Sequence, residues 1–90
     1  MHETGIVRDI VHRLEAAAKD VGAIRVSGLD IRLGALCQFS PAHFHEHFDD
    51  EARGTLAEGA KLRIHLSDDP ADPHAQAVMM ESIDLEMPEE

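Results

Sequence analysis

Apolar residues near the start of the chain recur three or four positions apart: Val7, Ile10, Val11, Leu14, Ala17, Ala18 and Val21. This spacing is typical of an amphipathic helix with one face turned to a core. Thr4 is the candidate N-cap of the helix, and Gly22 is the candidate residue that ends it. The sequence therefore predicts that the first element is a helix.

The apolar pattern changes period over residues 24–33. Ile24 and Val26 alternate with polar residues, and Leu29, Ile31 and Leu33 alternate in the opposite phase. The two sets share one face of a strand only if one extra residue is inserted where the phase slips, at Ser27-Gly28. We therefore expect one strand with a β-bulge, ended by Gly34.

A second helix is predicted from residue 40 to about residue 53. Ser40 is a suitable N-cap, and Pro41 occupies the first helical position, where proline is favoured. Phe44 and Phe48 lie one turn apart and are expected to face the core. Downstream, Thr55-Leu56-Ala57-Glu58 matches a capping box and predicts one short helical turn.

Two further strands are predicted in the last part of the chain. In the first, Leu62, Ile64 and Leu66 are expected to point inward and Lys61, Arg63 and His65 outward. Residues 67–74 are rich in Asp and Pro and predict a loop. In the last strand, Ile83, Leu85 and Met87 are expected to share one face.

The order helix, strand, helix, strand, strand predicts an α+β fold. Two helices can cover one face of a three-stranded sheet, which gives a two-layer domain. Because the chain has 90 residues, we expect a single domain over residues 1–90.

Charge limits the choice of partners. The chain has 8 basic and 18 acidic side chains and a formal net charge of -10, which argues against nucleic acids and anionic membranes. Residues 67–90 hold 8 of the acidic side chains and none of the basic ones, so this stretch is either solvated or a docking surface for a basic partner. Apolar runs are far shorter than the ~20 residues of a membrane span, and the start lacks the features of a signal peptide. We therefore expect a cytoplasmic protein without a membrane segment.

Nothing in the sequence predicts catalysis. Cys37 is the single cysteine, so the chain can form neither an internal disulfide nor a four-cysteine zinc site. His43 is near Cys37 in sequence, but no third group that could orient the pair is identifiable. We therefore predict that the protein is not an enzyme.

Histidine is frequent, with seven residues, and three of them form the run His43-Phe44-His45-Glu46-His47. On a helix His43 and His47 are i, i+4 neighbours that could chelate one metal, whereas His45 points elsewhere. Without a third ligand, such a surface pair is more often incidental.

The chain start is the more specific candidate metal site. The amine of Met1 and the backbone and imidazole nitrogens of His2 can form fused chelate rings, and the backbone nitrogen of Glu3 can supply a fourth donor. Nitrogen sets of this kind suit square-planar Ni(II) or Cu(II), and these donors alone do not distinguish the two metals.

Together these features resemble the HypA/HybF family of hydrogenase nickel-incorporation proteins. The resemblance covers residues 1–66 and about 82–87. The matching stretches are Met1-His2-Glu3, the first helix, Ile24-Arg25-Val26, Arg32-Leu33-Gly34-Ala35-Leu36, Pro41 through Phe48, Gly54-Thr55-Leu56-Ala57-Glu58-Gly59-Ala60-Lys61-Leu62 and Ser82-Ile83-Asp84-Leu85-Glu86.

The resemblance implies a nickel metallochaperone that assists [NiFe]-hydrogenase maturation. It places nickel at Met1, His2 and Glu3 and implies a HypB-type GTPase and the hydrogenase large subunit as partners. Some family members serve urease, so the client enzyme stays open. The protein is expected to be a monomer or a weak homodimer.

This chain departs from the family pattern before its last strand. The family carries a zinc-binding insertion with two Cys-x-x-Cys pairs there, whereas an acidic loop, expected over residues 67–81, replaces it in this sequence. We therefore expect Ni(II) and no zinc site. The missing zinc module leaves a second hypothesis open, in which the protein is a metal-independent adaptor in a hydrogenase maturation complex.

Overall fold

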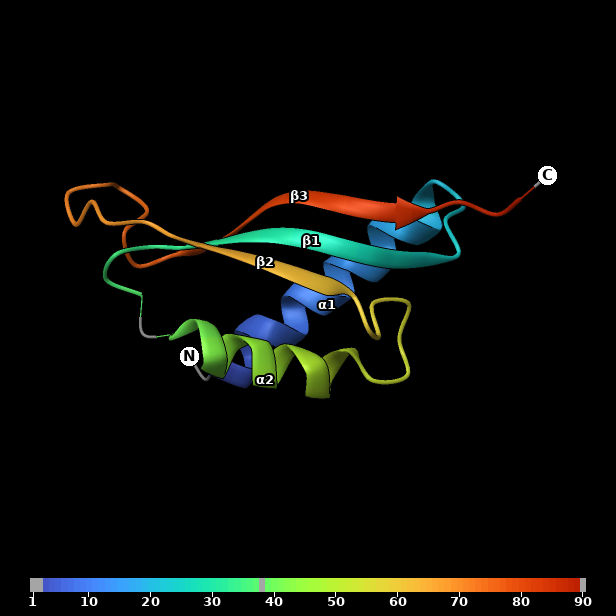
Figure 1. Ribbon diagram of the computed structural model, residues 1–90, viewed down its shortest axis with the longest axis horizontal. Helices are drawn as coiled ribbons and strands as arrows, with labels where there is room; N and C mark the ends of the chain where they lie inside the picture. Colours follow the sequence, from blue (N-terminus) through green and yellow to red (C-terminus); the bar gives the residue numbers. More distant parts are fainter. Residues whose placement is uncertain (1–2, 38, 90) are drawn as a thin grey trace.

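The computed structural model describes residues 3–37 and 39–89. Its elements follow the chain as α1 (Glu3–Asp20), β1 (Arg25–Leu33), α2 (Pro41–Ala52), β2 (Lys61–Leu66) and β3 (Val78–Glu86). The strands form one mixed sheet in the order β2-β1-β3, and both helices lie on the same side of it (Figure 1). This arrangement confirms the predicted α+β class.

The central strand β1 pairs with both of its neighbours. It runs parallel to β2, with Leu29 opposite Leu62, and antiparallel to β3, with Leu29 opposite Ile83. A parallel pair needs a long crossover connection, and α2 lies in that connection between β1 and β2. The sheet and the helix pair are therefore linked by chain topology as well as by packing.

The core lies between the sheet and the helices. Phe44 and Phe48 of α2 are fully buried, as predicted. The other fully or almost fully buried apolar residues of the helices and β1 are Val7, Ile10, Val11, Leu14, Ala18, Val26, Leu29, Ile31, Leu33 and Ala52. The prediction for Val21 is wrong, because α1 ends at Asp20 and the Val21 side chain is 54% exposed.

Gly22 ends α1 as predicted. Its φ of 75° lies in the left-handed region that glycine adopts without steric cost. The amide of Gly22 donates to the carbonyl of Lys19 (3.2 Å), and the amide of Ala23 donates to that of Ala18 (2.8 Å), which is the bonding pattern of a Schellman motif. At the other end, α1 already includes Glu3, so Thr4 lies inside the helix and is not its N-cap.

The β-bulge in β1 is also confirmed. The pairing with β3 shifts between Val26 and Gly28, which leaves Ser27 as the extra residue and brings Val26 onto the same buried face as Leu29. A second shift, between Asp30 and Ile31, was not predicted. Ile24 lies outside the strand and is 49% exposed, so its predicted place on the shared face of the strand is wrong.

The predictions for β2 and β3 need three corrections. Leu66 is 64% exposed because it is the last residue of an edge strand. Met87 lies beyond β3 and is 51% exposed. Because β3 begins at Val78, the connection between the strands spans residues 67–77 instead of 67–81.

Residues 53–59 form turns, and the short helix predicted after α2 is not present among them. The Thr55 hydroxyl accepts a hydrogen bond from the amide of Ala57 (3.1 Å) and donates to the carbonyl of Ala52 (2.7 Å). A capping box would instead join the Thr55 side chain to the amide of Glu58. The Thr55 hydroxyl therefore ties the turn to the end of α2.

A polar network joins the three strands on the outer face of the sheet. Arg63 of β2 donates to both carboxylate oxygens of Asp30 in β1 (2.8 and 3.2 Å) and to Asp84 in β3 (2.6 Å). Ser82 also donates to Asp30, and Nε2 of His65 lies 3.1 Å from the same carboxylate. The bonds from Arg63, Ser82 and His65 hold the pKa of Asp30 well below its ordinary value, and Asp30 and Asp84 raise the pKa of Arg63.

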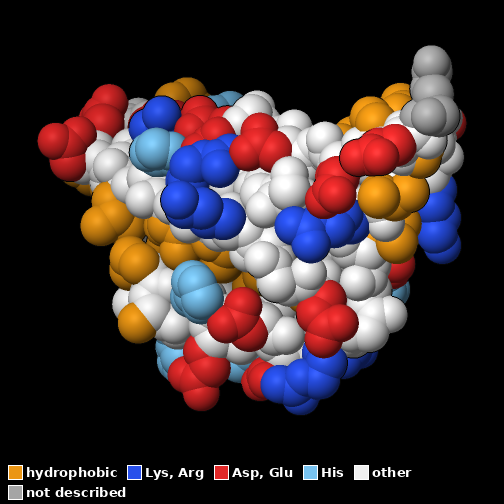
Figure 2. Space-filling model, turned by 45° about the vertical axis from the view of Figure 1, so that its right-hand side comes forward, with side chains coloured by type: hydrophobic (Ala, Val, Ile, Leu, Met, Phe, Trp, Pro, Cys, Tyr) orange, Lys and Arg blue, Asp and Glu red, His pale blue; other side chains and the backbone are white. Residues whose placement is uncertain are grey.

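The acidic residues of β3 pair with arginines of the sheet. Glu81 contacts Arg32 (3.0 Å), Glu86 contacts Arg25 (2.7 Å), and Asp84 belongs to the Arg63 network. Figure 2 shows Lys and Arg side chains adjacent to Asp and Glu side chains across one face of the molecule. This part of the acidic stretch is therefore built into the sheet and is not a free tail.

We predict that Asp30→Asn makes the free energy of unfolding less dependent on pH in the acid range. The folded-state pKa of Asp30 lies below the value of about 3.9 in an unfolded chain, so its ionised form stabilises the fold above that pH. This contribution is lost as the pH falls from the unfolded-state value toward the lower pKa of the folded state. Urea unfolding at about pH 7 and about pH 3 should show a smaller difference for the variant than for the native chain. Asp68→Asn, in the 67–77 connection, is the control and should keep the native difference.

We predict that Gly34→Ala destabilises the fold by about 2 kcal/mol. A Cβ at residue 34 would overlap the backbone carbonyl of Ala75, and the amide of Gly34 also donates to the carbonyl of Ala77 (3.0 Å). Gly5→Ala is the matched control, because a Cβ at this helical position meets no atom within 4 Å, and it should stabilise α1 by about 0.5 kcal/mol. Urea unfolding of both variants checks the contrast, and equal midpoints would contradict it.

Candidate metal site

The predicted N-terminal site falls mainly outside the described residues. Met1 and His2 lie outside them, and for Glu3 the structure gives its place as the first residue of α1. The first four amides of an α-helix have no partner within the helix. The amide of Glu3 is therefore not required for helix bonding, which is a condition for using its nitrogen as a metal donor.

The start of α1 is held against α2. Arg8 donates through Nε and Nη2 to the two carboxylate oxygens of Glu51 (3.1 and 3.2 Å), and Val7 is fully buried. The bond from Arg8 lowers the pKa of Glu51, and charge on His12 and His47 lowers it further. The packing and this ion pair fix where the chain enters α1.

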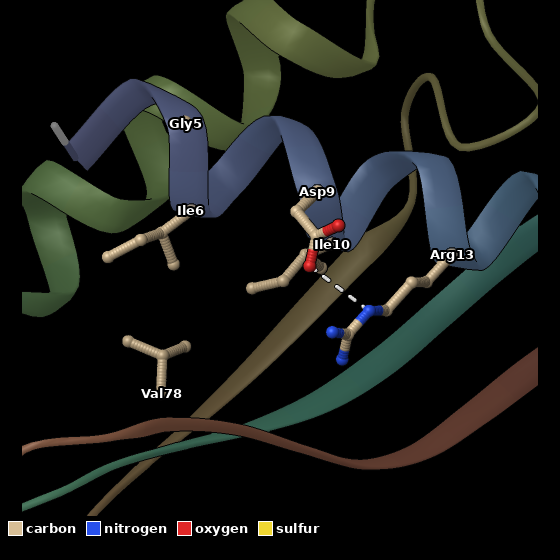
Figure 3. Close-up of a pocket in the computed structure, with 6 residues that line it drawn as sticks. All are labelled: Gly5, Ile6, Asp9, Ile10, Arg13 and Val78. Carbon is tan, nitrogen blue, oxygen red and sulfur yellow. Dashed lines mark ion pairs between the residues drawn. The ribbon is translucent and has the colours of Figure 1, made fainter. Parts of the chain in front are cut away.

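A groove of about 500 Å³ lies between α1 and β3. Ile6 and Ile10 point toward Val78 across it, and Asp9 is paired with Arg13 (3.1 Å; Figure 3). Since an arginine neutralises the one carboxylate of this wall, the groove offers no set of metal donors.

The histidine pair lies at the start of α2. The side chain of Ser40 accepts a hydrogen bond from the amide of His43 (3.2 Å), and Pro41 occupies the first turn, so the predicted N-cap is confirmed. The rings of His43 and His47 have centroids 5.2 Å apart and planes inclined by 51°. The structure therefore brings together the two histidines that the i, i+4 spacing pairs.

The other polar residues of the histidine run lie apart from this pair. Nδ1 of His45 is 3.1 Å from a carboxylate oxygen of Asp49, and both side chains are about half exposed. Glu46 is exposed, so it does not disturb the packing of Phe44 and Phe48. His45 therefore points elsewhere, as the helical spacing indicates.

The described part of the chain holds no larger donor cluster. In residues 3–37 and 39–89 no group of three His, Cys, Asp or Glu side chains could hold a metal ion. Cys37 is a half-buried free thiol. Over the same residues, no helix is both long and apolar enough to cross a membrane.

A family model covers the first four-fifths of the chain. Residues 1–72 match the family model described as "Hydrogenase/urease nickel incorporation, metallochaperone, hypA". The chain belongs to the HypA family. The description of the family names a metallochaperone, which is the role that the resemblance implies.

Individual relatives agree with this assignment. The chain is 38% identical over 64 residues to the hydrogenase maturation factor HypA of Acidithiobacillus ferrooxidans, a match that covers 71% of this chain and 57% of the relative. It is 41% identical over 64 residues to that of Chlorobium limicola, covering 71% and 55%. The chain thus spans a little over half the length of the curated relatives that it matches.

The fold is that of a solved HypA. The solution structure of the Ni metallochaperone HypA from Helicobacter pylori matches with a TM-score of 0.81 at 14% identity, over 98% of this chain and 100% of that one. At this identity the likeness concerns the fold.

Sequence reasoning missed the contact that joins the two helices. Arg8 of α1 bonds to Glu51 of α2, and charge on His12 also acts on this carboxylate. The sequence contains only part of the signal for this contact. Glu51 follows His47 by four residues, as His47 follows His43, so the three side chains share one face of α2.

We predict that Ser40→Ala frays the first turn of α2 and loosens the His43–His47 contact. Loss of this N-cap should lower the free energy of unfolding by about 1 kcal/mol, because the amide of His43 loses its partner. Urea unfolding measures the cost, and nuclear Overhauser contacts between the two rings report the local effect. Ser67→Ala, at a residue outside any helix, is the control and should leave the ring contacts unchanged.

Proposed function

We propose that this protein assists [NiFe]-hydrogenase maturation by binding Ni(II) at its N-terminus and handing it on. Membership of the HypA family is the observation that carries the proposal. The Met1-His2-Glu3 sequence supports it, because these residues lead directly into α1.

The chemistry of these three residues fits nickel. An unblocked Met1 amine, the backbone nitrogen and imidazole of His2 and the backbone nitrogen of Glu3 give four nitrogen donors for a square-planar ion. Coordination by backbone nitrogen requires loss of its proton, and the positive end of the helix dipole favours the negative charge that results. Because all four donors come from one chain end, a partner can displace them stepwise, which suits an ion that must be released.

Delivery of nickel would take place in the cytoplasm and would need two partner proteins. A HypB-type GTPase and the hydrogenase large subunit would receive or exchange the nickel in the cytoplasm. The 67–77 connection contains no cysteine, so nickel affinity would not be coupled to a zinc site in it. Urease is the alternative client.

We predict that the native chain binds about one Ni(II) at this site and that His2→Ala or acetylation of the Met1 amine abolishes this binding. Isothermal titration at about pH 7.5 measures it. Affinity should fall as the pH drops through about 6.5, because only a neutral imidazole binds metal. His74→Ala removes an exposed histidine from the 67–77 connection and is the control that should bind as the native chain does.

Unchanged titrations in His2→Ala and in acetylated protein would rule out this site. The adaptor hypothesis, which the cysteine-free connection favours, predicts a different outcome in cells. In that case deletion of the protein impairs hydrogenase assembly, whereas His2→Ala leaves it intact. Mass spectrometry of the mature N-terminus is part of the test, because the proposed donors require a free Met1 amine.

A further inference from the structure

The separation of the His43 and His47 rings fits two imidazoles bound to one metal ion. A metal at about 2.1 Å from one nitrogen of each imidazole lies roughly 3.2 Å from each ring centroid. Two such rings at about 90–110° around the metal then have centroids roughly 4.5–5.2 Å apart, whereas rings on opposite sides of the metal are roughly 6.4 Å apart. The observed 5.2 Å matches rings on adjacent coordination positions.

The surroundings orient one ring of this pair and leave both side chains within reach of solvent. His43 is exposed, and His47 is half-buried with its ring edge-on to Phe39, at a centroid distance of 6.4 Å. One turn further on, both carboxylate oxygens of Glu51 are held by Arg8. Glu51 therefore does not act as a third ligand in this arrangement, and water would complete the coordination.

The pair also lies close to the part of the fold where the chain enters α1. Figures 1 and 3 both place the first turns of α1 alongside the first half of α2, and Arg8 and Glu51 join the two helices. Residues 1 and 2 are joined directly to that turn of α1.

We propose that His43 and His47 form a second metal site, which binds a first-row divalent ion through two imidazoles and otherwise through water. Imidazole nitrogens suit Ni(II), Cu(II) and Zn(II), and Cu(II) is expected to bind most tightly. With two protein donors, the site binds more weakly and exchanges faster than a four-nitrogen site. Its use as a second holding position for nickel rests on the function proposed above, whereas its ability to bind metal does not.

The experiment compares four forms of the full chain: native, His2→Ala, the double variant His43→Gln/His47→Gln, and the control His45→Gln. Each is titrated with NiCl₂ and with CuCl₂ by calorimetry at about pH 7.5. Native protein should show a tighter and a weaker class of sites. The weaker class should lose at least about tenfold in affinity in the double variant, because the linked pair of donors is gone, and should be retained in the other two forms.

The thermal midpoint gives a second readout. An ion bound across one helical turn stabilises the folded state, so saturating Ni(II) should raise the midpoint of acetylated native protein and of acetylated His45→Gln. The double variant, acetylated in the same way, should show no such rise. Line broadening of the His43 and His47 ring signals by Ni(II), observed by NMR, would assign the site directly.

The outcomes separate this site from the N-terminal one. If the weaker class survives in the double variant, or disappears equally in His45→Gln, the second site is wrong whatever His2→Ala does. If only the tighter class fails to respond to His2→Ala, the proposed function loses its site while the histidine pair stands. Circular dichroism of every variant without metal excludes unfolding as the cause of a loss.

Discussion

Burial of the single apolar face of the sheet is the constraint on which the rest of the fold depends. β1 lies in the middle of the sheet, and its side chains Leu29, Ile31 and Leu33 are fully buried beneath the helices. Full burial of a side chain of this size stabilises a fold by about 1.5–3 kcal/mol, whereas an exposed ion pair contributes about 0–1 kcal/mol. Hydrophobic burial therefore sets the layers, and the arginine–carboxylate pairs on the opposite face refine the register of the strands.

This constraint also determines where the candidate metal donors lie. The apolar stripe of α1 leaves the helix one orientation on the sheet, and Phe44 and Phe48 do the same for α2. α2 then carries the histidine pair on the stripe that continues to Glu51, and Arg8 of α1 bonds to Glu51. A core made of aliphatic side chains and phenylalanines thus fixes the positions of the side chains that would bind a metal ion.

Local patterns predicted most of the fold, because period, caps and glycines act within a few residues. The Ser40 cap, the left-handed Gly22 and the bulge at Ser27 are all of this kind. Predictions failed where exposure depends on distant neighbours. Leu66 has the alternation of a buried strand residue but ends an edge strand, and Val21 continues a helical stripe beyond the last turn of α1.

The candidate site was predictable to a different extent. The i, i+4 spacing of His43 and His47 places two imidazoles together on any helix, so sequence alone paired them. The contribution of Arg8, His12 and Glu51 depends on how two helices cross, which neither helix encodes by itself. The donors of Met1 and His2 lie outside the described residues, and their role stays a prediction from sequence and family.

The distribution of charged side chains determines how the surface of the protein would attract a cation. Within residues 3–37 and 39–89, every arginine is engaged in an ion pair: Arg8, Arg13, Arg25, Arg32, Arg53 and Arg63. The formal charge of -10 is therefore an excess of carboxylates, which draws divalent cations to the surface without selecting among them. Selection falls to nitrogen donors, because imidazole and amide nitrogen prefer Ni(II) or Cu(II) over the harder Mg²⁺ and Ca²⁺. If the protein binds nickel as proposed above, its carboxylates would raise the rate of capture and its histidines would set the choice of metal, so the two properties could be altered separately.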